Sequence, residues 1–161
     1  MNNSENNERN HNIFIYDHIK VFFKHTDYYG LVHQYNYLEW MSYAREAFFN
    51  KIFPAFMTDD ILTTISMVTI KAEYEHYNDA KFGDEISIII YTENVRRVSF
   101  DVIFEFYNKA SNNKLGLGKQ TLVFLQREST RPAYIPNELF YEIKLGEKKN
   151  GTADARTTIH S

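Results

Sequence analysis

The sequence predicts an α+β protein in which an antiparallel sheet wraps around one long helix. Two observations support this prediction: one segment places its apolar residues at helical spacing, and the segments that follow it read as strands. The expected order of elements is β-α-β-β-β-β. We expect a single domain, because 161 residues can build one core but are too few for two ordinary domains.

The first strand and the helix come before the rest of the sheet. The strand is expected at His18–Phe23 and the helix at about Tyr35–Lys51. Pro54 should end the helix, because proline cannot continue a helix and disfavours helical geometry in the residue before it. The helix face turned to the sheet is expected to contain Tyr37, Leu38, Met41, Ala44, Arg45, Phe48, Phe49 and Ile52.

Four strands are expected after the helix, separated by turn residues such as Gly83 and Asp84. The expected ranges are Thr63–Tyr77, Ile86–Glu93, Val98–Tyr107 and about Leu115–Gln126. The third of these alternates aromatic and aliphatic residues with Asp101 and Glu105, which is typical of a half-buried strand.

The two ends of the chain are expected to be disordered tails, residues 1–12 and 146–161, around a domain at residues 13–145. Their few apolar residues cannot offset the entropy lost on ordering. The edge strands of the sheet are expected to be long and exposed, and proteins often cover such edges with a second subunit. We therefore expect a homo-oligomer, either a dimer or a tetramer.

The composition excludes several classes of function. A net charge of -3 gives no electrostatic reason to expect nucleic acid as a partner. No apolar run approaches the roughly 20 residues that cross a bilayer, and the polar start lacks the apolar stretch of a secretion signal, so we expect no membrane partner and a cytoplasmic location. Without cysteine, any nucleophile must be an oxygen or a nitrogen.

One segment between the first strand and the helix, TDYYGLVHQYNYLEWMSYARE, resembles the signature of the hotdog-fold thioesterases related to 4-hydroxybenzoyl-CoA thioesterase (YbgC-like). The shared pattern is Asp-x-x-Gly-hydrophobic-Val, then Asn-Tyr, then Ala-Arg. Two further segments, YEHYNDAKFGDEISI and RPAYIP, are similar to later parts of that family, so the resemblance covers about Tyr16 to Ile143. The NYLEW and ARE segments also resemble thioesterases of enediyne polyketide pathways, which usually carry Asn where this chain has Asp27.

The resemblance implies a hotdog fold and hydrolysis of acyl-CoA or acyl-carrier-protein thioesters. Asp27 is then the nucleophile or the general base, and the backbone N–H of Gln34, seven residues later, polarises the thioester carbonyl. These roles suit the chemistry, because hydrolysis needs a base or nucleophile and a helix N-terminus offers unpaired N–H donors. Many members have His at the Gln34 position and Tyr at the Phe23 position; His33 is the nearest candidate to replace that histidine.

Four further residues are candidates for substrate binding. Tyr28, Tyr29 and Gly30 follow the acid, and Arg45 resembles the arginine of the Ala-Arg motif. Arg45 has an alternative role in a structural ion pair with a strand carboxylate, since arginine is rarely buried without a partner.

Neither a metal nor a cofactor is expected. The spacing of His25, Asp27 and His33 would permit metal ligation, but no supporting pattern accompanies it.

Several alternatives remain open from the sequence alone. Asp27 can be a turn residue without a catalytic role, and Asn36 with Glu39 three residues later can cap the helix in place of the expected start. At the level of function, the alternatives to a thioesterase are a non-catalytic acyl-binding or interaction module and a hotdog dehydratase. A dehydratase of this fold resembles a different pattern, with a His-Asp or His-Glu pair.

Overall fold

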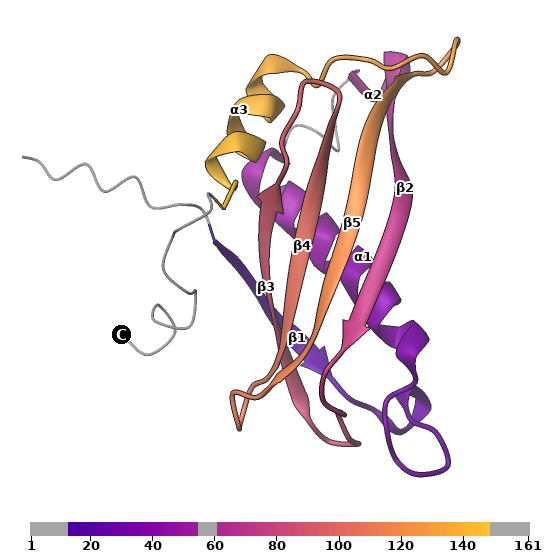
Figure 1. Ribbon diagram of the computed structural model, residues 1–161, viewed down its shortest axis with the longest axis vertical. Helices are drawn as coiled ribbons and strands as arrows, with labels where there is room; N and C mark the ends of the chain where they lie inside the picture. Colours follow the sequence, from indigo (N-terminus) through magenta and orange to yellow (C-terminus); the bar gives the residue numbers. More distant parts are fainter. Residues whose placement is uncertain (1–12, 55–60, 149–161) are drawn as a thin grey trace, which may run out of the picture.

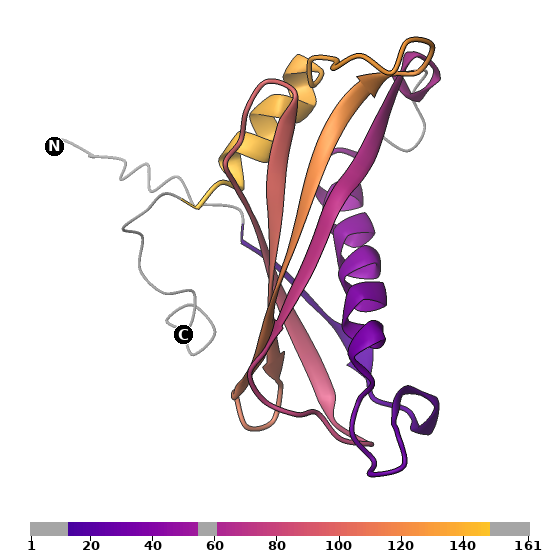
Figure 2. The same cartoon turned by 45° about the vertical axis from the view of Figure 1, so that its right-hand side comes forward.

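Five antiparallel strands form one sheet, and the longest helix lies across one face of it (Figure 1, Figure 2). The computed structural model describes residues 13–54 and 61–148, so the predicted tail at residues 1–12 and residues 149–161 of the other predicted tail lie outside the described part. The elements are β1 (Phe14–Lys20), a 3-10 turn (Phe23–His25), α1 (Gln34–Ile52), α2 (Ile61–Thr64), β2 (Ile65–His76), β3 (Glu85–Glu93), β4 (Ser99–Asn108), β5 (Lys114–Gln126) and α3 (Asn137–Leu145).

The strand order is β1-β3-β4-β5-β2, which confirms the predicted α+β class. The first strand was expected at His18–Phe23, but β1 ends at Lys20. Lys20 pairs with Glu85, the first residue of β3, and Val21 still donates to the Asp84 carbonyl and accepts from the Gly83 N–H, so the backbone pairing ends one residue beyond β1. Phe22 and Phe23 are therefore exposed near the 3-10 turn.

Helix α1 starts and ends within one residue of the prediction, but it is rotated relative to the expected face. Leu38 is 39% exposed, whereas Trp40, which was not expected on the buried face, is buried. The larger ring removes more apolar surface from water than leucine does. The buried residues of α1 are Asn36, Tyr37, Trp40, Met41, Ala44, Phe48 and Phe49.

Two glycines of β5 make room for side chains that pack closely against this strand, one from α1 and one from β2. A Cβ on Gly118 would lie 2.7 Å from the Met41 sulfur, and one on Gly116 would overlap the Tyr74 hydroxyl. Any larger residue would therefore push the helix or the tyrosine away.

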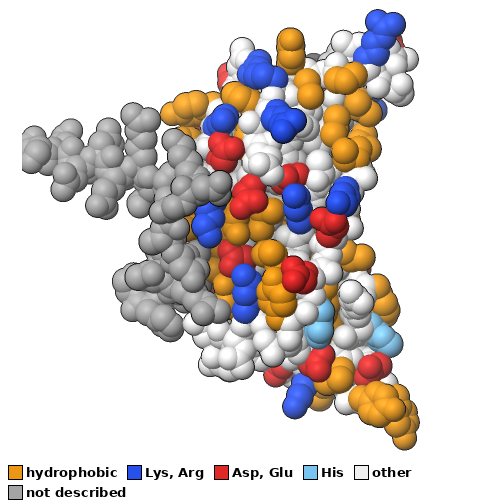
Figure 3. Space-filling view, viewed as in Figure 1, with side chains coloured by type: hydrophobic (Ala, Val, Ile, Leu, Met, Phe, Trp, Pro, Cys, Tyr) orange, Lys and Arg blue, Asp and Glu red, His pale blue; other side chains and the backbone are white. Residues whose placement is uncertain are grey.

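The face of the sheet turned away from α1 carries charges of both signs around a small apolar cluster (Figure 3). Asp101 and Glu105 on this face are buried, so the prediction of a half-buried β4 with exposed acids was wrong. Lysines of β5 account for the difference: Lys119 contacts Asp101 at 3.2 Å, and Lys114 contacts Glu105 at the same distance.

Helices α2 and α3 were not expected. Leu139 and Ile143 of α3 join the core that α1 covers, and the Thr92 hydroxyl donates to the Ile143 carbonyl at 2.7 Å. After α3, the backbone of Lys148 donates to the Thr92 carbonyl at 2.9 Å, so this part of the predicted tail lies against β3. Among the described helices, none has the length and apolar character needed to span a membrane.

Candidate active site

Asp27 lies in a short hairpin between β1 and α1. Thr26 pairs with Val32 across the hairpin, and the Asp27 N–H donates to the Leu31 carbonyl at 2.8 Å. Gly30 closes the turn with φ of +74°, a left-handed conformation that costs glycine little and most other residues more. The sequence therefore places an acid at the base of a tight, glycine-dependent loop.

The two oxygens of the Asp27 carboxylate differ in their contacts. Oδ1 accepts hydrogen bonds from the N–H groups of Tyr29 at 2.8 Å and Leu31 at 3.1 Å. Within residues 13–54 and 61–148, no group donates to Oδ2. Asp27 thus has the turn role that the sequence left open, and one oxygen remains for chemistry.

The hairpin is attached to the molecule by backbone bonds on one side. The Val32 N–H donates to the Ala80 carbonyl at 3.0 Å, and the Phe82 N–H donates to the Gly30 carbonyl at 3.3 Å. These contacts place the segment that precedes β3 beside the second half of the hairpin.

Asn36 attaches the hairpin to the helix. Its side-chain amide donates to the carbonyl of His25 at 2.9 Å and to that of His33 at 3.2 Å. The alternative cap formed by Asn36 and Glu39 is therefore wrong, because α1 begins at Gln34 and Asn36 lies inside its first turn. The sequence reasoning missed this role, which depends on two carbonyl groups that meet only in the folded chain.

The start of α1 leaves backbone donors unpaired. His33 precedes the helix without a side-chain cap, and no described residue accepts a hydrogen bond from the N–H of Gln34 or Tyr35. The Gln34 N–H was the expected oxyanion donor, and it stands at the first position of the helix, where the macrodipole also favours negative charge. The His33 ring is exposed and stacks on the Tyr35 ring, with 5.4 Å between centroids.

His25, at the first end of the hairpin, contacts the residues on which the hairpin rests. Its Nδ1 accepts a hydrogen bond from the Phe22 N–H at 2.9 Å, and its ring meets the buried Trp40 edge-on at 5.2 Å. Burial and the neighbouring Lys24 charge lower the pKa of His25. His25, Asp27 and His33 do not form a metal-binding group among the described residues.

Tyr28 and Tyr29 project from the hairpin. They are 96% and 81% exposed, and their rings meet edge-on at 5.5 Å. Hydrophobic side chains gather at this end of the molecule in Figure 3. Two neighbouring tyrosines thus present aromatic surface beside the acid in the single chain.

Arg45 does not form the ion pair that was its alternative role. Its guanidinium donates to the Thr69 hydroxyl at 2.8 Å and to the Gln120 side-chain oxygen at 2.7 Å. Both partners are neutral, and burial lowers the pKa of Arg45. The prediction of a strand carboxylate partner was therefore wrong, and a half-buried positive charge remains between α1 and β2.

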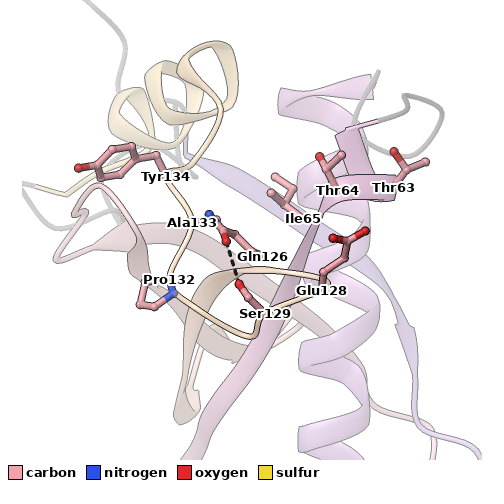
Figure 4. A pocket seen from close by; sticks show the side chains of 9 residues that line it. All are labelled: Thr63, Thr64, Ile65, Gln126, Glu128, Ser129, Pro132, Ala133 and Tyr134. Carbon is pink, nitrogen blue, oxygen red and sulfur yellow. Dashed lines mark hydrogen bonds between the residues drawn. The ribbon is translucent and has the colours of Figure 1, made fainter.

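A cavity of about 780 Å³ lies at the opposite end of the sheet. Figure 4 shows it between the end of α2 and the start of β2, at Thr63 to Ile65, and the end of β5 with the chain that follows, at Gln126 to Tyr134. None of the residues predicted for the site lines this cavity.

The chain belongs to the thioesterase-like superfamily, which it matches over residues 21–143. This membership supports thioester hydrolysis as its general activity. No curated protein matches the sequence closely enough to be counted as related.

Solved structures of similar fold include three thioesterases. The dynemicin thioesterase, studied for polyene binding, is 21% identical, covers 85% of this chain and 99% of its own, and superposes with a TM-score of 0.76. Slr0204, a 1,4-dihydroxy-2-naphthoyl-CoA thioesterase from Synechocystis, is 17% identical over 82% of this chain and 96% of its own, with a TM-score of 0.74. BH1999, a gentisyl-coenzyme A thioesterase, is 22% identical over 78% and 98%, with a TM-score of 0.66. At these identities the likeness establishes the hotdog fold.

Proposed function

We propose that the protein hydrolyses acyl-CoA or acyl-carrier-protein thioesters, with Asp27 as nucleophile or general base. The observation that supports this proposal is that the chain holds a carboxylate and unpaired backbone N–H groups close together, between the Asp27 hairpin and the start of α1. A carboxylate with a free oxygen stands in a hairpin, and Asn36 holds both ends of that hairpin at the unpaired N–H groups of α1. Asn36 therefore fixes the position of the Asp27 hairpin relative to the start of the helix.

The chemistry assigns a separate task to each group. Oδ2 of Asp27 attacks the carbonyl carbon or takes a proton from water, while the Gln34 N–H donates to the oxygen as it gains negative charge. His33 precedes that N–H, and we assign its exposed ring to the rim of the site.

The same site offers surface for the substrate. Tyr28 and Tyr29 present aromatic faces to an acyl or aryl group, and Gly30 allows backbone to approach it without a side chain. Arg45 supplies a positive charge between α1 and β2 that has only neutral partners. Aromatic or polyunsaturated acyl groups would suit this surface, because rings stack on extended π-systems.

A second copy of the chain is the proposed partner of β2. This strand forms one edge of the sheet, and Ile70 on it is 62% exposed. A two-fold axis beside an edge strand pairs it antiparallel with its copy. In such a dimer the end carrying Asp27 would lie beside the partner's opposite end, the one with the cavity of Figure 4. Light scattering should report a dimer or tetramer, and a stable monomer at micromolar concentration would exclude this arrangement.

The test of the activity is Asp27→Asn, assayed on a panel of acyl-CoA and acyl-carrier-protein thioesters. The change keeps the shape of the side chain and removes its charge, so turnover should fall by about 10² or more while the melting temperature stays near that of wild type. Asp17→Asn is the matched control, because this exposed aspartate of β1 contacts Lys109 and stands outside the site.

Two results would count against the proposal in different ways. Full activity of Asp27→Asn across the panel would exclude an acid-dependent mechanism. No activity of the wild-type protein on any thioester would instead favour an acyl-binding module on the same fold.

A further inference from the structure

A second acid–base pair lies at the end of β2. Nε2 of His76, the last residue of the strand, is 2.9 Å from Oδ1 of Asp79 in the turn that follows. Both side chains are partly exposed. No role in the proposed mechanism has been given to either residue.

The contacts of α1 with β2 place His76 at the level of the helix start. Tyr37 stacks on Tyr74 with 4.4 Å between ring centroids, and further along the helix Arg45 bonds to Thr69, so the two elements run in opposite directions. From that stack, Gln34 is three residues back along the helix, about 4.5 Å. His76 is two residues forward along the strand, about 6.6 Å in the same direction.

The ring of His76 is also close to the first turn of α1. Its centroid is 6.3 Å from that of Tyr37. The turn containing Asp79 leads directly to Ala80, whose carbonyl accepts the hydrogen bond from Val32 in the Asp27 hairpin. Asp27 and Ala80 are thus about two strand spacings apart, roughly 10 Å. His76 and the segment that binds the Asp27 hairpin therefore both lie near the helix start.

The bond to Asp79 determines which nitrogen of His76 is available. A carboxylate accepts a proton donor, so it favours the tautomer that carries hydrogen on Nε2. Nδ1 then has a free lone pair, and no residue in the described ranges donates to it. An aspartate likewise orients the histidine of a catalytic triad, although there it binds Nδ1 and leaves Nε2 as the base, whereas here the two nitrogens are exchanged.

We propose that His76 is the base that activates the hydrolytic water, with Asp79 as its positioning residue and Asp27 as the nucleophile. This inference rests on the proposed thioesterase activity and decides between the two roles left open for Asp27.

The reaction then has two steps. In the first, Oδ2 of Asp27 forms a bond to the acyl carbon, the carbon–sulfur bond breaks, and the thiolate takes a proton from solvent. In the second, a water oxygen bonds to the acyl carbon while His76 Nδ1 takes one water proton. The bond from the acyl carbon to Asp27 breaks, which releases the acid and restores the carboxylate; His76 returns its proton to solvent.

The groups that face His76 allow this role. They are Asp79 from the following turn, Tyr37 from α1 and Tyr74 from its own strand. Burial raises the pKa of Tyr37 to about 12 and raises that of Tyr74 as well, so both hydroxyls stay neutral at neutral pH. Asp79 is the charged group among the three.

The test is His76→Gln in the full chain, followed by rapid mixing with a thioester that the wild-type protein hydrolyses. Loss of the base slows the second step alone, so steady-state turnover should fall by about 10². The first turnover should release a burst of about one thiol per site, as expected when an acyl-enzyme accumulates. Asp79→Asn should give a smaller fall, about tenfold, with a burst of the same kind.

His18→Gln is the matched control, because His18 is an exposed histidine 3.8 Å from Asp17, outside the site. It should match wild type. The proposal is overturned if His76→Gln keeps turnover within threefold of wild type, or if turnover falls without a burst. Should His76→Gln fail to fold, Asp79→Asn decides by the same two measurements. A wild-type protein inactive on every thioester would refute the proposed function itself.

Discussion

The carboxylates of the Asp27 hairpin and of β4 show how one chemical group acquires two roles. Asp27 is partly exposed, and its hydrogen bonds come from backbone N–H groups of its own loop to a single oxygen. Glu105 is 3% exposed and accepts hydrogen bonds from the Tyr107 hydroxyl at 2.8 Å and from Lys114 at 3.2 Å. Each acid has one oxygen that accepts no hydrogen bond from the described residues, but that of Glu105 is buried, and the other oxygen of Glu105 is paired with a cation inside the sheet face.

Changes at the two acids should therefore affect different properties: activity at Asp27 and stability at Glu105. A buried, paired carboxylate leaves an unpaired cation when it is removed, and this costs free energy of folding. Neutralising a partly exposed carboxylate that its own loop holds should cost little free energy of folding, yet such a carboxylate can take part in catalysis. Three experiments, two on Glu105 and one on Asn36, test this distinction between the two kinds of acid.

The largest effect is expected for Glu105→Ala. The change removes the partner of Lys114 and the acceptor of the Tyr107 hydroxyl, so the free energy of unfolding should fall by about 2–3 kcal/mol. Urea unfolding at fixed protein concentration measures this, and thioesterase activity of the folded fraction should be unchanged.

Glu73→Ala is the matched control for that experiment, because Glu73 pairs with Lys71 on the surface at 2.6 Å. Exposed pairs contribute about 0–1 kcal/mol. Equal losses in the two variants would show that the β4 acids are no more structural than a surface pair.

The second prediction concerns the loss of stability at low pH. Burial alone raises the pKa of Glu105, but the hydrogen bond from Tyr107 and the charge of Lys114 outweigh it, so the pKa lies below its ordinary value. For Asp101, hydrogen bonds from Asn94 and Thr121 outweigh burial in the same way and lower the pKa. A lowered pKa contributes stability that is complete above the unfolded value, about 4.3 for glutamate, and is lost as pH falls through the folded value.

Melting temperatures of wild type and Glu105→Gln should therefore converge on acidification. We expect a clear difference at pH 7 that shrinks below about pH 4, because the unfolded wild-type chain is protonated there first, and that disappears once the folded carboxyl is neutral as well. A difference that stays constant down to pH 3 would mean that the charge of Glu105 contributes nothing.

The smallest effect on stability is expected for Asn36→Ala. Losing the donor to the His25 and His33 carbonyls should cost about 1 kcal/mol, but it releases the hairpin from the helix start, so turnover should fall about tenfold. Asn50→Ala, an exposed change near the other end of α1, is the control and should alter neither quantity. Unchanged turnover in Asn36→Ala would show that the hairpin keeps its place without this side chain.

The sequence predicted the regular elements better than their surroundings. Periodicity located α1 and the strands from β2 to β5 within one or two residues, because those patterns arise from local geometry. Alternation did not reveal that Asp101 and Glu105 are buried, since their lysine partners come from β5 and meet them only in the sheet register. Helix α3 was missed although Leu139 and Ile143, four residues apart, were a visible signal.

In the candidate site, too, the sequence identified some residues but not their partners. Asp27, Gly30 and Gln34 stood out by their motif, and the structure places them in one hairpin and at one helix start. The partners of Arg45 could not be predicted, because Thr69 and Gln120 belong to two different strands. His76, near the end of an expected strand, and Asp79, in the turn that follows, are three residues apart, and that spacing was a signal that the sequence reasoning did not use.

The way in which Asn36 holds the hairpin has a consequence for engineering. Its amide binds main-chain carbonyl groups, which every amino acid possesses, so the closure of the loop does not depend on which side chains occupy it. Tyr28 and Tyr29 can therefore be randomised together in a combinatorial library while the acid and Gly30 are retained. Such a library would vary the acyl groups accepted without redesigning the scaffold.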